Sequence, residues 1–235
     1  MEGTLRSAMH SQRPRLTLSA LLALALMVAA VALIAYYAPE DADQGLSQKI
    51  FYFHVPIALT AYACFGWAAW KAFRHLSRRQ AGADLESYVA VHMGIIFGVL
   101  TLATGSIWAR ISWGVWWTWG SDQLVLFLVL FLFYCAYMML RFSVADGPQR
   151  ANLCAVYALF GVVLIPVSFF AIRLSRDLIH PVVFNQHGPQ MAGSMLLTLC
   201  VSYAALLALA STLYRIEVAG KRIEKRLRDL KELRG

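Results

Sequence analysis

Long apolar stretches alternate with short polar ones along most of the chain. About 20 apolar residues suffice for a helix to cross the hydrocarbon core of a bilayer. Helices are expected there because a helix satisfies its own backbone hydrogen bonds in lipid. The predicted fold class is therefore all-α, a polytopic membrane protein with six transmembrane helices. The expected spans are residues 16–38, 51–73, 87–107, 123–140, 151–174 and 192–214.

The first span and the last segment each allow a second interpretation. Three arginines precede residues 16–38, as in a signal peptide, but acidic residues follow in place of a small-residue cleavage site, so a retained helix is expected. Residues 1–214 are predicted to form one membrane domain, and residues 215–235 a basic helical tail in the cytoplasm. Weak adhesion of that tail to anionic lipid is the alternative.

Composition and charge fit this class and give an orientation. Hydrophobic residues make up 60% of the chain and charged residues 14%, unlike a soluble domain. With both termini in the cytoplasm, 17 of the 21 Lys and Arg residues lie inside, as the positive-inside rule requires. Both termini are thus expected inside, and the net charge of +8 reflects topology and not nucleic-acid binding. The outer connections would hold Lys49, Arg110, Arg173 and Arg176.

Motifs of covalent or catalytic chemistry are missing from the sequence. The four cysteines lie in the spans and form neither C-x-x-C nor C-x-x-C-H, so they are interpreted as packing residues. No Walker loop, G-x-S-x-G or H-E-x-x-H is present. The chain is therefore expected not to be an enzyme.

Four tryptophans stand in a connection between the third and fourth spans, where residues 113–119 read WGVWWTW. One or two would be typical of the aromatic belt at a membrane interface. Four on a single loop favour a binding surface, and we expect a flat aromatic shelf for a large planar ligand. The residues are Trp113, Trp116, Trp117 and Trp119.

Histidines are predicted on the same outer face. His54 precedes Pro56, and proline is favoured in the first turn of a helix, so Pro56 is expected to start the second helix with His54 at its outer edge. His180 and His187 lie in the last outer connection. His92 lies within the third span, as a structural hydrogen-bonding group or a functional one. His10 and His75 are expected to be solvated on the cytoplasmic side.

Imidazoles beside an aromatic shelf suit haem. Imidazole is a common axial ligand of haem iron. Guanidinium groups bind carboxylates through paired hydrogen bonds, which makes Arg110, Arg173 and Arg176 candidates for the propionates. Contact between these arginines and lipid phosphates is the alternative for each.

At these residues the chain resembles the tryptophan-rich "WWD" family of haem-handling proteins of cytochrome c maturation, and within it the smaller CcmC branch. The resemblance covers roughly residues 45–215 and includes the HVP at His54, the TGS at 104–106, the tryptophan loop and His180. It implies that His54 and His180 ligate a non-covalent, b-type haem. It also implies that the protein lies in the inner (plasma) membrane and that the tryptophan loop holds the haem on its periplasmic face. It further implies delivery to a chaperone like CcmE, and partnership with the ABC-transporter pair CcmA/CcmB and a small subunit like CcmD.

The chain departs from the pattern of that family at two places. The motif usually ends in Trp-Asp, whereas Trp119 is followed by Gly120, which leaves Asp122 as the candidate replacement for the carboxylate. His187 is an additional outer histidine that could compete with His180.

The predicted function is haem binding and delivery for c-type cytochrome biogenesis. Two alternatives stay open. A membrane b-type cytochrome that exchanges electrons with quinone would need histidine pairs within the spans, where only His92 lies deep. A transporter of another amphiphilic solute would need interrupted spans, for which Pro166 is the strong candidate.

Overall fold

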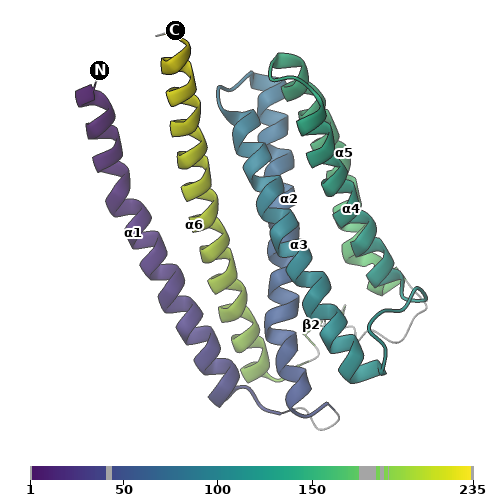
Figure 1. Cartoon of the computed structure of the whole chain (residues 1–235). Helices are drawn as coiled ribbons and strands as arrows, with labels where there is room; N and C mark the ends of the chain where they lie inside the picture. The colour runs from purple at the N-terminus through teal and green to yellow at the C-terminus, as the bar shows by residue number, and fades with distance from the viewer. Residues whose placement is uncertain (1, 41–43, 175–183, 186–187, 190, 234–235) are drawn as a thin grey trace.

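The computed structural model of the chain is a bundle of six long helices with both termini at the same end (Figure 1). The structure describes residues 2–40, 44–174, 184–185, 188–189 and 191–233, and gives the backbone alone for 2–15, 172–174 and 184–185. The helices are α1 (Glu2–Ala32), α2 (Phe51–Arg78), α3 (Ala83–Trp113), α4 (Asp122–Ser143), α5 (Pro148–Leu174) and α6 (Gly193–Glu232). Two antiparallel strands of two residues each, β1 (Phe184–Asn185) and β2 (Gly188–Pro189), precede α6.

The all-α prediction with six membrane spans is confirmed. Within the described residues, six helices are long and apolar enough to cross a bilayer. An even number of crossings returns the chain to the side on which it began, as the positions of the termini require. Which side is the cytoplasm stays a prediction from the Lys and Arg distribution.

The ends of several helices differ from the expected ones. α1 begins at Glu2 and passes into a π-helical turn, η1 (Leu33–Tyr37), while α6 continues unbroken from Gly193 to Glu232. The prediction that Pro56 starts the second helix is wrong, because a 3-10 turn, η2 (Leu46–Ile50), leads into α2 at Phe51. Proline lacks the N–H that would bond to the carbonyl of Tyr52, so α2 forgoes that one hydrogen bond and continues.

α2 is the central helix of the bundle. It packs against α3, α5 and α6, while α4 packs on α5 and α1 lies along α6 at one side (Figure 1). At its middle, the ring of Phe65 stacks on Tyr134 of α4 with centroids 3.9 Å apart. A Cβ at Gly94 of α3 would lie 2.4 Å from the Phe65 ring, so a glycine is needed for this close approach.

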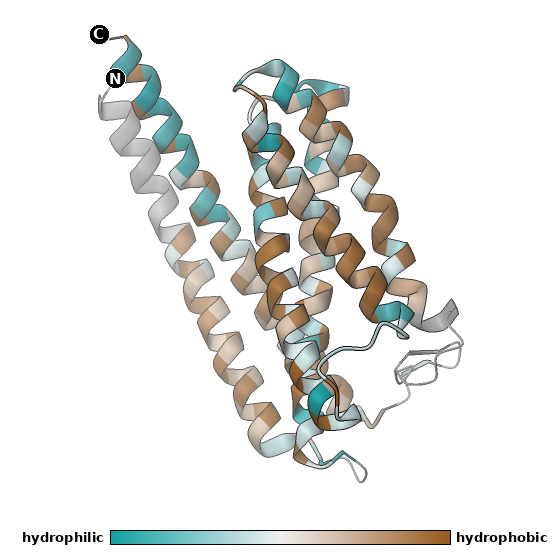
Figure 2. Cartoon of the chain, turned by 45° about the vertical axis from the view of Figure 1, so that its right-hand side comes forward, coloured by the Kyte–Doolittle hydropathy of each residue, from teal (hydrophilic) through white to brown (hydrophobic). Residues whose placement is uncertain are grey.

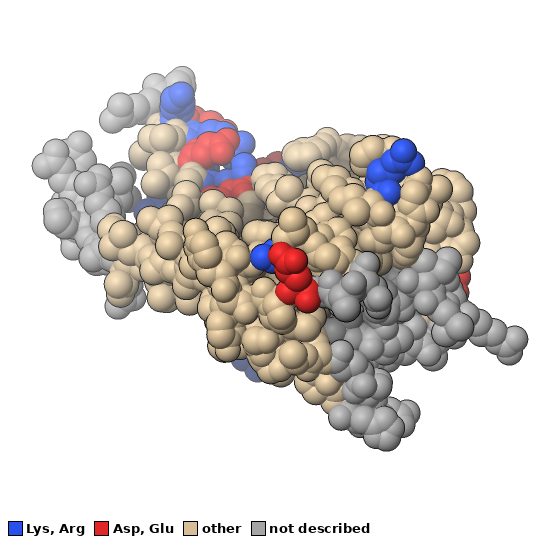
Figure 3. All heavy atoms as spheres, turned by 90° about the horizontal axis from the view of Figure 1, so that it is seen from below, with Lys and Arg blue, Asp and Glu red and all other residues tan. Residues whose placement is uncertain are grey.

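Apolar side chains cover the middle of the bundle, and polar ones gather toward its ends (Figure 2). Large apolar residues such as Leu18, Phe160 and Val163 are exposed on its sides, where lipid would surround them. Seen from the end opposite the termini, the described surface carries few charged side chains (Figure 3). The tryptophan loop lies at that end, between α3 and α4.

Candidate functional site

The backbone of the tryptophan loop is fixed by the end of one helix and the start of the next. α3 ends at Trp113, and Gly114 follows with a φ of +76°, a left-handed conformation that glycine adopts without strain. Nη1 of Arg110, in the last turn of α3, donates to the carbonyl oxygen of Gly114. Arg110 therefore supports the helix end, and its other N–H groups are the ones available to a carboxylate.

The tryptophans lie edge to face and not as one flat shelf. The rings of Trp117 and Trp119 meet with centroids 5.7 Å apart and an interplanar angle of 70°. Trp113 meets Trp108 at 5.0 Å and 75°. Trp116 and Trp119 are 59% and 73% exposed. Three of the four expected shelf residues thus belong to two angled pairs, an arrangement that aromatic rings favour over a parallel sandwich.

Trp108 is a fifth member of this group that the sequence analysis did not single out. It lies on α3 five residues before Trp113, and its Nε1 donates to the side-chain oxygen of Gln44 over 3.3 Å. The only sign in the sequence was that Trp108 lies close to the tryptophan motif. Sequence does not show whether a tryptophan at the end of an apolar span faces the loop or the lipid.

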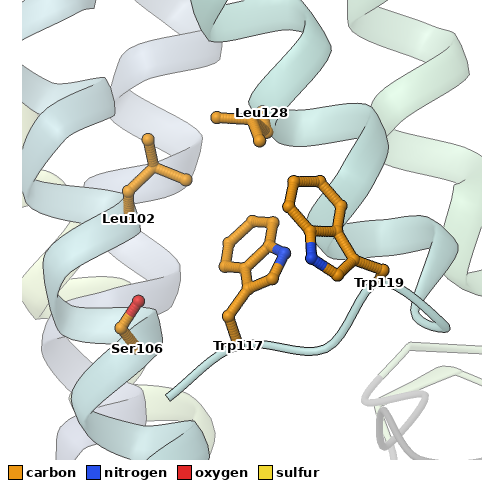
Figure 4. A pocket seen from close by; sticks show the side chains of 5 residues that line it. All are labelled: Leu102, Ser106, Trp117, Trp119 and Leu128. Atoms are coloured by element: carbon orange, nitrogen blue, oxygen red, sulfur yellow. The ribbon is translucent and has the colours of Figure 1, made fainter.

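A pocket of about 280 Å³ lies between α3 and α4 beneath the loop. The indole rings of Trp117 and Trp119 lie side by side along one edge of it, with their nitrogens on the sides that face each other, and Ser106 and Leu102 lie on the α3 side (Figure 4). Nε1 of Trp117 is buried and has no hydrogen-bond partner among the described residues. The pocket is a small, open hollow with mostly apolar walls and one buried donor beside it. The remaining lining residue is Leu128.

His54 lies in the first turn of α2 and contacts α3. Its Nδ1 is 3.0 Å from the hydroxyl oxygen of Thr104. A Cβ at Gly105 would lie 2.9 Å from Cε1 of the imidazole, so the ring rests against the α3 backbone. His54 is half-buried at this contact, on the loop side of the bundle. Residues 104–106 thus touch His54 through 104 and 105 and line the tryptophan pocket through 106.

Several predicted site residues lie outside the described part of the chain. These are His180, His187 and Arg176, while Arg173 is described by its backbone alone as part of α5. Their proposed roles stay predictions.

Asp122, the candidate replacement for the family's carboxylate, is the first residue of α4 and is exposed. A carboxylate in the first turn of a helix is stabilised by the helix dipole. The backbone N–H of Gly120 bonds to the Thr118 hydroxyl over 3.3 Å. The position of Asp122 at the start of α4 suits a carboxylate, and any role of this side chain toward a ligand stays a prediction.

An ionic network at the opposite end of the bundle was not predicted. Arg141 of α4 donates from Nη1 and Nη2 to the two carboxylate oxygens of Asp84 on α3, each over 2.9 Å. Glu86 pairs with Lys71 at 2.6 Å and also with Arg222 of α6. The network ties α2, α3, α4 and α6 together.

His92 belongs to this end of the molecule. Its Nδ1 lies 2.9 and 3.0 Å from the two carboxylate oxygens of Glu217 on α6, and its ring lies over Tyr88 at 6.5 Å. His75, expected to be solvated, bonds through Nε2 to the side-chain oxygen of Asn152 over 3.1 Å. Within the described residues, His92 therefore makes the structural hydrogen bond that was one of its two expected roles.

Comparison with known proteins gives a consistent match. The family described as "CcmC: Heme exporter protein C" matches residues 5–232. A heme exporter protein C from Bradyrhizobium diazoefficiens is 32% identical over 194 residues, 82% of this chain and 73% of that protein. The proteins of that name from Paracoccus denitrificans and Escherichia coli K12 are 34% and 31% identical over 62% and 58% of this chain. These two matches span 60% and 56% of the relatives, a little over half of their length.

Proposed function

The chain belongs to the heme exporter protein C (CcmC) family, and from that premise we propose that it binds haem at the periplasmic end of the bundle and delivers it for c-type cytochrome biogenesis. The receiver is a periplasmic chaperone like CcmE. The protein acts by binding and transfer rather than catalysis, in the inner membrane, together with an ABC-transporter pair like CcmA/CcmB and a small subunit like CcmD.

The observation that carries this proposal is the short segment 104–106 of α3. Thr104 and Gly105 contact His54, and the next residue, Ser106, lines the pocket with two of the tryptophans. An imidazole and a pair of angled indole rings are thus brought to adjacent faces of one helix turn. This pairing suits haem, since imidazole is a common ligand of haem iron and the porphyrin is a large planar ring.

The donor set of these residues fits haem. When bound, haem would supply an iron centre that imidazoles can ligate. His54 and His180 would hold that iron, while the ring and the chaperone would pack against the loop of Trp113, Gly114, Trp116, Trp117 and Trp119. The absence of a C-x-x-C-H motif supports non-covalent binding.

The structure offers little support for the alternative functions. An electron-carrying cytochrome would need paired histidines within the spans, and His92 is engaged by Glu217 instead. A transporter of another solute would be expected to have broken helices near mid-membrane. α5 continues through Pro166 without interruption.

The first test is the absorption spectrum of the protein purified in detergent with haem added. A Soret band is expected, and His54→Ala or His180→Ala should leave a haem-poor or five-coordinate protein. His75→Ala is the control, because His75 lies at the opposite end and bonds to Asn152. A full Soret band in the His54→Ala, His180→Ala double variant would refute the ligand assignment. Rapid reduction of the bound haem by quinol would favour the cytochrome instead.

A second test separates binding from delivery. Stacking on an aromatic ring contributes about 1–3 kcal/mol per nucleobase, and we assume a similar energy for porphyrin. Haem held by two histidines should therefore stay partly bound when one tryptophan is removed, whereas delivery also needs the loop to pack against the chaperone. Trp116→Ala and Trp119→Ala should thus keep some haem but lose most c-type cytochrome production in cells. Trp70→Ala, an exposed tryptophan of α2 stacked on Phe73, is the matched control. Normal cytochrome c in both loop variants would mean that the loop is a membrane belt.

A further inference from the structure

The hydroxyl group of Thr104 lies beside Nδ1 of His54 and also contacts the backbone of its own helix. This hydroxyl donates to the backbone carbonyl of Leu100 over 2.8 Å and lies 3.3 Å from that of Thr101. A hydroxyl has one hydrogen and two lone pairs. When its hydrogen is directed at the backbone, the hydroxyl accepts a hydrogen bond from the imidazole nitrogen 3.0 Å away.

In that arrangement the proton of a neutral imidazole would lie on Nδ1, and the lone pair on Nε2. A metal-ligating histidine usually donates its other ring N–H to an oxygen, which fixes the tautomer and the ring orientation and makes the ligand more basic. The Thr104 hydroxyl is in the position of that oxygen.

Gly105 fixes the place of the ring along α3. Its ideal Cβ would lie 2.9 Å from Cε1 of His54, 3.5 Å from Nδ1 and 3.7 Å from Nε2. Real Cβ atoms do not approach a ring carbon so closely, so alanine would push the imidazole away from Thr104. Glycine is disfavoured inside a helix such as α3. The close approach of the imidazole explains why a glycine stands at position 105.

We propose that Thr104 and Gly105 are positioning residues that hold His54 as the Nδ1–H tautomer, with the Nε2 lone pair presented to haem iron. This inference rests on the proposed haem-binding function for its purpose. The tautomer itself is a property of the protein without haem and can be measured separately.

The proton position is tested on the apo protein in detergent, labelled with 15N-histidine. The His54 signals are those that disappear in His54→Ala. In the wild type, Nδ1 should show a bonded proton and Nε2 none, and Thr104→Val should populate the Nε2–H form. Thr104→Ser keeps the hydroxyl and should keep the tautomer. Thr101→Val is the matched control, since Thr101 makes the same helical bond, to the Phe97 carbonyl, one turn earlier. An Nε2–H tautomer in the wild type, or no change in Thr104→Val, overturns the proposal.

Haem titration then tests the consequence. Thr104→Val should weaken binding by about 10–100-fold, the usual effect of removing such a partner, and raise the midpoint potential because a less basic ligand stabilises ferric iron less. Gly105→Ala should weaken binding similarly, while Thr104→Ser and Thr101→Val should remain within about three-fold of the wild type. Loss of haem in His54→Ala with unchanged affinity and potential in Thr104→Val would refute the positioning role and leave the haem function standing. Wild-type affinity in His54→Ala would refute the haem-ligand assignment, whatever the tautomer.

Discussion

Breaking the Arg141–Asp84 pair should be among the most destabilising single changes in the bundle. The side chains are 8% and 23% exposed, and the guanidinium forms two 2.9 Å hydrogen bonds with the carboxylate. Its carbon also lies 4.5 Å from the centre of the Tyr88 ring. Removing one partner leaves the other charge buried and uncompensated, which costs about 3–5 kcal/mol in comparable pairs.

A double-mutant cycle isolates the interaction from the packing that each side chain also contributes. Asp84→Ala and Arg141→Met, the latter keeping most of the aliphatic stem, should each destabilise the protein strongly. The double variant should lose less than the sum of the two, because no unpaired charge remains. The expected coupling energy is about 2–3 kcal/mol, toward the upper end of measured pairwise couplings.

The chain provides its own control in Asp146 and Arg150. This pair lies four residues apart at the surface, and the Asp146 side chain is 75% exposed. Surface pairs of this spacing contribute about 0.3–0.5 kcal/mol. Both cycles are measured as free energies of unfolding in detergent micelles, from reversible SDS titrations followed by circular dichroism. A coupling energy for Asp84 and Arg141 no greater than for the surface pair would refute the reasoning from burial.

Two further predictions concern packing and topology. Gly94→Ala should destabilise the bundle by about 1–3 kcal/mol, because the added methyl overlaps the Phe65 ring. Gly66→Ala is the control: its added methyl has no heavy atom within 4 Å, so the change should be neutral or stabilising by up to about 1 kcal/mol. Equal shifts of the melting temperature in both variants would contradict the close approach. A reporter that is active only outside the cytoplasm should be active when fused after Asp122 and inactive after Gly147, and the reverse pattern would place the tryptophan loop in the cytoplasm.

The sequence alone determined the six spans and the position of the tryptophan loop between the third and fourth helices. These features depend on local composition, because in lipid each apolar segment must satisfy its own backbone hydrogen bonds. The charge distribution likewise predicted an orientation without any knowledge of packing. The resemblance of residues 113–119 and of His54 to one family was also visible in sequence, and the family assignment is confirmed.

The tertiary structure decided which residues from different helices meet. Arg141 counted in the sequence only as one of 17 inner positive charges, but it is buried against Asp84, 57 residues away. In the sequence Thr104 was only part of a short motif, but in the structure it contacts His54, which lies 50 positions earlier in the chain. Such pairings depend on the rotation and depth of one helix against another, which apolar composition does not encode. For the same reason the sequence predicted a cluster of aromatic rings beside a histidine but not the angles between those rings or the tautomer of the imidazole.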